Sequence, residues 1–109
     1  MKLSNIFVFK IIIMSTKHHI FKEIDLITSL GNTLLKGKDD ETSKYVEINE
    51  SDYMKFRTHL LLFIDDYFGK HSVYYKLFEP LKGNLAGNVK SGLEILDTIK
   101  KRMKLKHNE

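Results

Sequence analysis

The sequence contains no cysteine and no tryptophan, and only one of its 109 residues is a proline. Without cysteine the chain forms no disulfides, binds no metal through thiolates and has no thiol nucleophile, and this absence fits a reducing cytoplasm. The scarcity of proline favours long helices, because proline breaks a helix interior. The sequence also lacks a glycine-rich nucleotide-binding pattern and the H-x-x-x-H spacing of many zinc sites. These absences exclude several common kinds of enzyme and metalloprotein.

The composition indicates one soluble domain with an unevenly distributed positive charge. Hydrophobic residues make up 42% and charged residues 29% of the chain, and this length suits a single core. The net charge is +4, and its excess lies in residues 98–107, which contain no acid. The basic residues of this segment are Lys100, Lys101, Arg102, Lys104 and Lys106. Such a cluster can bind phosphate groups, or it can be a solvated helix end whose cations complement the helix dipole.

The N-terminal segment is apolar. Residues 6–14 read I-F-V-F-K-I-I-I-M. This run is shorter than the roughly 20 residues that cross a bilayer, and no small-residue signal-peptide cleavage site follows it. It could be an extension upstream of a true start at Met14, a short buried strand, or a loosely attached arm for a partner. We expect residues 1–15 to form an apolar extension outside a helical domain of residues 16–106.

Apolar residues recur at helical spacing in four segments, which predicts an all-α fold, a small bundle of about four helices. The first helix is expected to begin at residue 16 or 17 and to end at residue 36. Its apolar stripe contains Ile20, Ile24, Ile27, Gly31 and Leu34. The other helices are expected at residues 52–68, 73–79 and 88–104.

The helix ends are marked by short polar residues and by glycine. The expected N-caps are Asn49 or Ser51, Ser72, and Asn88. Gly37 and Gly69 supply residues that tolerate positive φ just past two helix ends. Gly31 and Gly92 instead lie inside helices, where glycine costs about 1 kcal/mol relative to alanine. We therefore expect another helix, or a partner, to pass close to each of these two glycines.

No group of residues forms a recognisable reactive site. The adjacent pairs His18-His19 and Asp65-Asp66 point to different helix faces, so neither pair converges on a metal ion. No nucleophile is spaced with a base and an orienting group, so we predict no catalytic residue, no cofactor and no enzyme activity.

The aromatic residues between residues 53 and 78 lie mostly at core spacing. Tyr74 lies off this stripe, and we expect it to be the most exposed of them. An exposed aromatic residue is a common contact in protein interfaces. The predicted contact patch is therefore Tyr74, Leu77 and Leu81.

The order of the segments resembles a helical module found at the N-terminus of many bacterial anti-phage and abortive-infection proteins. The most specific element is F-G-x-x-S-x-Y-Y-x-x-F at residues 68–78, and the likeness extends over about residues 20–104. Supporting segments are I-D-L-I-T-S-L-G-N-T-L-L (24–35), Y-V-E-I (45–48), Y-M-K-F-R-T-H-L-L-L-F-I (53–64) and G-L-E-I-L-D-T-I-K (92–100). Family members usually carry tryptophan near the start of the second helix, where this chain has Phe56.

Such modules commonly precede a TIR-like, nuclease or nucleotide-sensing effector domain. The resemblance implies a recognition, oligomerisation or regulatory role, and it implies no catalytic residue. It leaves open a stand-alone adaptor, an antitoxin-like partner and a fragment of a larger protein.

We therefore expect a non-enzymatic protein-interaction or oligomerisation module in the cytoplasm, to which the resemblance adds an association with phage defence. The alternative is a small nucleic-acid-binding protein that uses its basic C-terminal helix end. A third and less favoured reading is a membrane-associated protein that uses residues 1–14.

Overall fold

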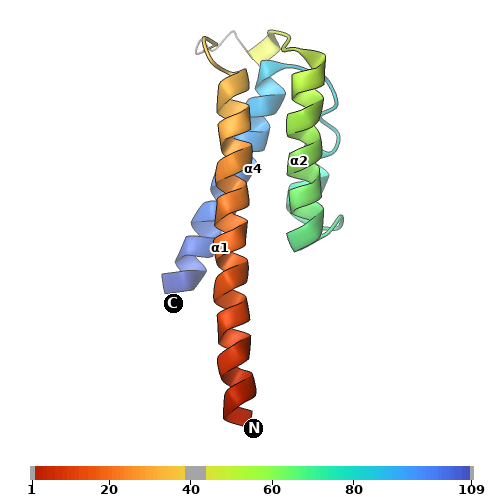
Figure 1. Cartoon of the computed structure of the whole chain (residues 1–109). Helices are drawn as coiled ribbons and strands as arrows, with labels where there is room; N and C mark the ends of the chain where they lie inside the picture. The colour runs from red at the N-terminus through yellow and green to blue at the C-terminus, as the bar shows by residue number, and fades with distance from the viewer. Residues whose placement is uncertain (1, 39–43, 109) are drawn as a thin grey trace.

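The computed structural model of the chain describes residues 2–38 and 44–108, with side chains for residues 17–38 and 44–105. Within these residues it forms four α-helices, and the only β-type pairing there is an isolated bridge between Glu47 and Leu85. The helices are α1 (Lys2–Leu34), α2 (Glu50–Phe68), α3 (Val73–Phe78) and α4 (Ala86–Asn108). Figure 1 shows α1 and α2 side by side and antiparallel, while α4 crosses α1. The predicted all-α bundle is confirmed.

Helix α1 begins at Lys2, so the start predicted at residue 16 or 17 is wrong. The apolar run of residues 6–14 is continuous with the amphipathic segment that follows, because no proline or glycine interrupts the helix between them. Figure 1 shows the N-terminal part of α1 extending past the end of α2, with its first turns extending past the end of α4 as well. A helix of 33 residues is about 50 Å long, which accounts for the longest dimension of the 58 × 24 × 21 Å chain.

Local capping residues define the start of α2 and of α3. The Asn49 side chain accepts a hydrogen bond from the Asp52 N–H at 3.0 Å, which selects Asn49 over the alternative cap. The Ser72 hydroxyl accepts one from the Tyr75 N–H at 3.2 Å. Gly69 follows α2 with φ of 86°, and its N–H bonds to carbonyls of the last helical turn. These three predictions are confirmed.

Helix α4 begins at Ala86, and the prediction of Asn88 as its N-cap is wrong. The Ala86 N–H donates to the Val46 carbonyl at 2.9 Å, so the segment before α2 satisfies this helix terminus. The Asn88 side chain lies in the first turn and donates to the Gly83 carbonyl at 2.7 Å. Because Val46 is far from Ala86 in the sequence, a local sequence pattern cannot predict this capping interaction.

The core lies where α1, α2 and α4 meet, and α3 closes it with Phe78. The buried hydrophobic residues are Ile20, Ile24, Ile27, Ile48, Tyr53, Phe56, Leu60, Phe63, Ile64, Phe78, Ala86, Val89, Ile95, Leu96 and Ile99. Phe56 and Phe78 pack edge to face, with ring centroids 6.1 Å apart. The stripe predicted for the first helix and the aromatic residues predicted at core spacing therefore supply much of this core.

The two glycines inside helices make room for the ring of Phe56. A Cβ atom added at Gly31 of α1 would lie 2.8 Å from Cε1 of Phe56, and one added at Gly92 of α4 would lie 2.9 Å from Cε2 and Cζ. The close helix approach expected from these glycines is confirmed, and it occurs inside the bundle. The ring of Phe56 therefore limits how closely α1 and α4 can approach α2.

Candidate protein-interaction surfaces

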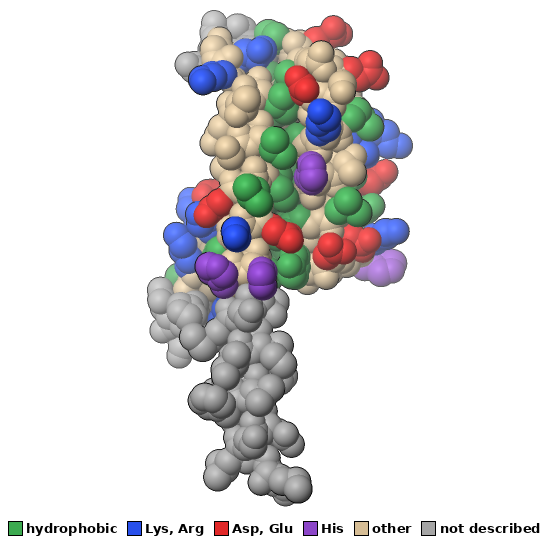
Figure 2. Space-filling view, in the orientation of Figure 1, with side chains coloured by type: hydrophobic (Ala, Val, Ile, Leu, Met, Phe, Trp, Pro, Cys, Tyr) green, Lys and Arg blue, Asp and Glu red, His purple; other side chains and the backbone are tan. Residues whose placement is uncertain are grey.

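A groove of about 790 Å³ runs along the surface between α1 and α2, and we call it the α1/α2 groove. Three leucines line it with large exposed fractions: Leu26 (61%), Leu30 (41%) and Leu62 (55%). Leu26 and Leu30 are four residues apart and so lie on one face of α1. Figure 2 shows hydrophobic side chains in a row between the two helices, with charged side chains on both sides. The α1/α2 groove is therefore an apolar surface with a charged border.

The charged border is acidic at the end of the groove where α1 and α2 carry Glu23 and Asp66. Burial raises the pKa of the neighbouring Tyr67 phenol, and the negative charges of Glu23 and Asp66 raise this pKa further. Both carboxylates are thus close to one phenol. Lys55 and His59 line the α2 side of the same groove. The groove therefore offers a negative end to any segment that enters it.

A second groove, of about 510 Å³, lies between α3 and α4, and we call it the α3/α4 groove. The three residues predicted as a contact patch all line it: Tyr74, Leu77 and Leu81. Leu77 is 58% exposed, whereas the other two are partly buried and pack against the core. The structure therefore brings the predicted residues together along one groove, with Leu77 as its exposed member.

Tyr74 is not the most exposed aromatic residue of residues 53–78, so that prediction is wrong. Its ring packs against Phe68 with centroids 5.2 Å apart, and its hydroxyl accepts a hydrogen bond from Arg102 at 2.9 Å. Phe68 is more exposed, at 37%, because it lies on the last turn of α2. Contacts from α2 and α4 cover Tyr74 in a way that the local helical pattern of α3 does not reveal.

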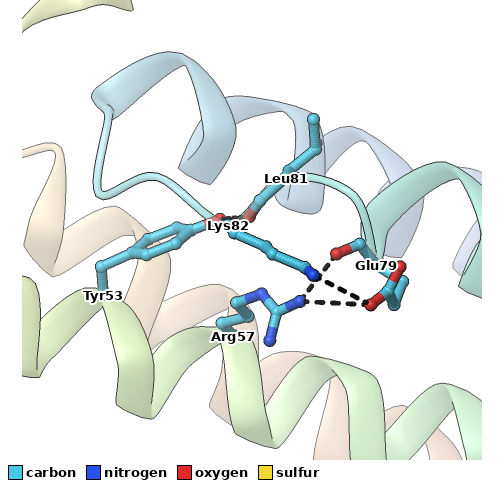
Figure 3. A network of polar contacts seen from close by, with 5 residues as sticks. All are labelled: Tyr53, Arg57, Glu79, Leu81 and Lys82. Atoms are coloured by element: carbon cyan, nitrogen blue, oxygen red, sulfur yellow. Dashed lines mark hydrogen bonds and ion pairs between the residues drawn. The ribbon is translucent and has the colours of Figure 1, made fainter.

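A polar network fixes the segment after α3 against α2 (Figure 3). The Tyr53 hydroxyl donates to the Leu81 carbonyl at 2.6 Å, and Arg57 Nη2 donates to the Glu79 carbonyl at 2.7 Å. The Glu79 carboxylate lies 3.9 Å from both Arg57 Nη2 and Lys82 Nζ. Burial raises the pKa of Tyr53 to about 12, against the opposing effect of the Arg57 charge. The network positions Leu81 and therefore one edge of the α3/α4 groove.

Two of the predicted phosphate-binding residues form ion pairs within the chain. Lys100 Nζ lies 2.8 Å from an Asp25 carboxylate oxygen and links α4 to α1. Lys101 Nζ lies 2.8 Å from Asp97 one turn earlier in α4, and this hydrogen bond raises the pKa of Lys101. Both pairs are exposed, and such pairs contribute only about 0.2–1 kcal/mol to stability. They nevertheless neutralise part of the charge of the basic cluster.

The other three basic residues differ in their surroundings. Arg102 donates to the Tyr74 hydroxyl, and its guanidinium lies 5.8 Å from the centre of that ring. Lys104 is exposed, and the side chain of Lys106 lies outside the described residues. Within the described part, the basic cluster is therefore divided between intramolecular contacts and solvent.

The α1/α2 groove was missed by sequence reasoning, although a signal for it is present. Leu26 and Leu30 form a second short apolar row beside the stripe that contains Ile24 and Ile27. Packing against α2 and α4 buries the isoleucines and leaves both leucines at the surface. An apolar row adjacent to a complete core stripe is thus the sequence signal for such a surface.

Among the side chains described for residues 17–38 and 44–105, no three His, Asp or Glu groups are placed to hold a metal ion. In the same part of the chain, no helix has the length and hydrophobicity needed to cross a bilayer.

Comparisons of the chain with protein-family models, with curated proteins and with solved structures found no match. The likeness to the helical module of anti-phage proteins therefore stays a prediction that rests on the sequence segments named above.

Proposed function

We propose that this protein is a non-enzymatic helical interaction module that binds another protein or a second copy of itself. The observation that carries the proposal is the α1/α2 groove, where Leu26, Leu30 and Leu62 are exposed on two packed helices. A contiguous apolar patch with a charged rim is typical of protein interfaces. Grooves between helices commonly accept the apolar face of a partner helix.

The α3/α4 groove is a second contact surface in this proposal, through Tyr74, Leu77 and Leu81. It is smaller than the α1/α2 groove, and Tyr74 already has partners within the chain. We therefore favour the α1/α2 groove as the principal interface.

An association with phage defence and a cytoplasmic location complete the proposal. Their support is the resemblance of residues 20–104 and the absence of cysteine. In the element at residues 68–78, Gly69 ends α2, Ser72 caps α3 and Phe78 is buried. Gly69, Ser72 and Phe78 therefore have structural roles, whereas Tyr74 and Leu77 of the same element line the α3/α4 groove.

The proposal is tested by measuring the mass of the full chain in solution, by light scattering over a range of concentrations. Leu26→Asp places a charge in the α1/α2 groove, and Leu105→Asp is its control, because Leu105 is similarly exposed (66%) and lies outside both grooves. We expect association that Leu26→Asp abolishes and Leu105→Asp preserves. For a different partner, cross-linking in the host should identify a protein whose capture is lost only with Leu26→Asp. A chain that stays monomeric and has no such partner would contradict the proposal.

Nucleic-acid binding is the alternative function, and no contact in the described residues specifically favours it. The ion pairs of Lys100 with Asp25 and of Lys101 with Asp97 weigh against it, because they reduce the charge available to phosphates.

A further inference from the structure

The face of the chain that carries the α1/α2 groove has an apolar middle and oppositely charged ends. Figure 2 looks onto this face. Its middle consists of three exposed leucines, Leu26, Leu30 and Leu62. Glu23 and Asp66 line one end of the groove, and Lys55 lines the other, with Asp52 one turn further out. The face therefore carries both signs of charge on either side of an apolar centre.

The charged residues of α2 are placed symmetrically about this centre. Lys55 lies four residues before His59, and Asp66 lies four residues after Leu62. All four side chains line the groove, and their spacing of three and four residues keeps them on one face of α2. The pair Lys55 and Asp66 and the pair His59 and Leu62 therefore share one midpoint, between residues 60 and 61. Along the helix, Lys55 and Asp66 each lie about 8 Å from that midpoint.

The midpoint of the two groove leucines on α1 is residue 28, and it lies at the level of the α2 midpoint. A Cβ atom at Gly31 would lie 2.8 Å from the ring of Phe56, so these two residues are neighbours. Glu23 is close enough to Tyr67 to raise the pKa of its phenol. Because α1 and α2 are antiparallel and rise equally per residue, these two contacts place residue 28 beside the middle of α2. The whole face thus has a single centre.

From this symmetry we infer that the α1/α2 groove binds the same face of a second copy of this chain. The two-fold axis crosses both helices at the centre of the face, so that α1 packs antiparallel on α1 of the second copy, and α2 on its α2. Leu26 then meets Leu30 of the second copy, and Lys55 meets its Asp66. Such an interface is isologous and closes as a dimer. This inference rests on the proposed function and names the partner of its principal surface.

Charge selects the antiparallel arrangement. A two-fold axis parallel to the helices would bring Glu23 and Asp66 of one copy against the same carboxylates of the second, where like charges repel. The axis across the helices instead forms the pair of Lys55 with Asp66 twice. Both side chains are exposed, and within the described residues neither forms an ion pair in its own chain, unlike Lys100 and Lys101. The face therefore supplies its own complementary charges.

The natural absence of cysteine allows a direct test in the full chain. We would combine Lys55→Cys with Asp66→Cys. Within one copy these positions lie 11 residues apart in α2, or about 16 Å, which is too far for a disulfide. In the proposed dimer they lie opposite each other, so mild oxidation should give a covalent dimer of twice the 12.8 kDa chain mass.

Two controls accompany this double variant. Each single variant should link much less, because equal positions of the two copies are about 16 Å apart along α2. Lys55→Cys combined with Asp65→Cys should also link poorly. Asp65 is turned about 100° around the helix from Asp66, and it does not line the groove. Single variants that link as well as the double variant would contradict the proposed register.

A charge exchange tests the same pair without a cross-link. Lys55→Asp and Asp66→Lys should each weaken dimerisation at least about tenfold, because each places like charges opposite one another at two symmetric positions. Both changes in one chain should recover most of the affinity, since opposite charges then meet with their signs exchanged. Light scattering over a range of concentrations measures the three affinities. A structural defect in a single variant would not be repaired by the second substitution.

The outcomes separate this inference from the proposed function. A dimer sensitive to Leu26→Asp that shows neither the cross-link between positions 55 and 66 nor the charge recovery would overturn the inference and leave the proposed function standing. A monomer that captures a different protein, with capture lost in Leu26→Asp, would do the same. A chain that is monomeric at all concentrations and captures no partner would overturn both.

Discussion

Gly31 of α1 and Phe56 of α2 are in direct contact: a Cβ atom on the glycine would lie 2.8 Å from Cε1 of the ring. On α4, Gly92 faces the same ring at Cε2 and Cζ. One aromatic side chain is therefore packed between two glycines from different helices. This arrangement explains why both helices keep a residue that lowers their own intrinsic stability.

The first prediction concerns these glycines. Gly31→Ala and Gly92→Ala should each lower the free energy of unfolding by about 1–3 kcal/mol, because the added methyl group overpacks the core. This loss should exceed the gain of about 1 kcal/mol in helix propensity. Urea denaturation followed by circular dichroism measures the change.

The control for these variants is Gly83→Ala, because the nearest atom to a Cβ at Gly83 is 3.8 Å away. Its stability should be close to that of the wild type. Adding Phe56→Leu to Gly92→Ala should cost less than the sum of the two single changes, since the smaller side chain relieves the clash. Alanine variants as stable as the wild type would show that the glycines are not needed for packing.

The N-cap of α2 provides a second prediction with a neighbouring control. Asn49→Ala should destabilise the protein by about 1 kcal/mol, because the Asp52 N–H loses its side-chain acceptor. Ser51→Ala lies within the first turn and should change stability by less than about 0.5 kcal/mol. Thermal or urea unfolding of the two variants measures the difference. Equal effects would mean that the Asn49 hydrogen bond contributes nothing.

The buried hydroxyl of Tyr53 predicts a specific alkaline instability. The folded chain holds this proton up to a pKa of about 12, whereas the unfolded chain releases it near the ordinary value of 10. The contribution of the neutral hydroxyl is therefore complete below pH 10 and is lost as the pH rises toward 12. Between pH 9 and 11 the wild type should lose about 1 kcal/mol of unfolding free energy more than Tyr53→Phe.

At neutral pH, Tyr53→Phe should itself cost about 1 kcal/mol, because the Leu81 carbonyl loses its donor. Tyr45→Phe is the control, since Tyr45 is 72% exposed. It should follow the wild type across the whole pH range. Parallel pH profiles for the wild type and Tyr53→Phe would show that the Tyr53 proton does not stabilise the fold.

The basic cluster gives a prediction that separates the two candidate functions. For the interaction module, we expect no measurable binding of a duplex of about 20 base pairs, or of a single strand of similar length, at about 50 mM salt. Fluorescence anisotropy measures this directly.

Tight binding of the duplex or the single strand, with an affinity that falls steeply as the salt concentration rises, would support nucleic-acid binding as the function. In that case, changing the five basic residues of the cluster to glutamine should flatten the salt dependence by about one unit of slope for each lost phosphate contact. The cluster consists of Lys100, Lys101, Arg102, Lys104 and Lys106.

Local signals were sufficient wherever the determining contacts lie within a few residues of each other. Asn49 and Ser72 bond to N–H groups three residues ahead, and Gly69 ends α2 through positive φ. The predicted start of α1 is wrong because the change in composition near residue 15 coincides with no helix-breaking residue, and the helix continues through it. The cap of α4 was missed because its acceptor, Val46, comes from a distant segment.

The sequence by itself determined the helical class, most of the core stripes and the local caps, because apolar periodicity and capping depend on near neighbours. Only the tertiary structure decided that Gly31 and Gly92 enclose the ring of Phe56 and that Lys100 pairs with Asp25. It also decided that Leu26 and Leu30 line an open groove, while the isoleucines beside them are buried. Exposure of an apolar side chain depends on which neighbouring helix covers it, and helix spacing alone does not specify that neighbour.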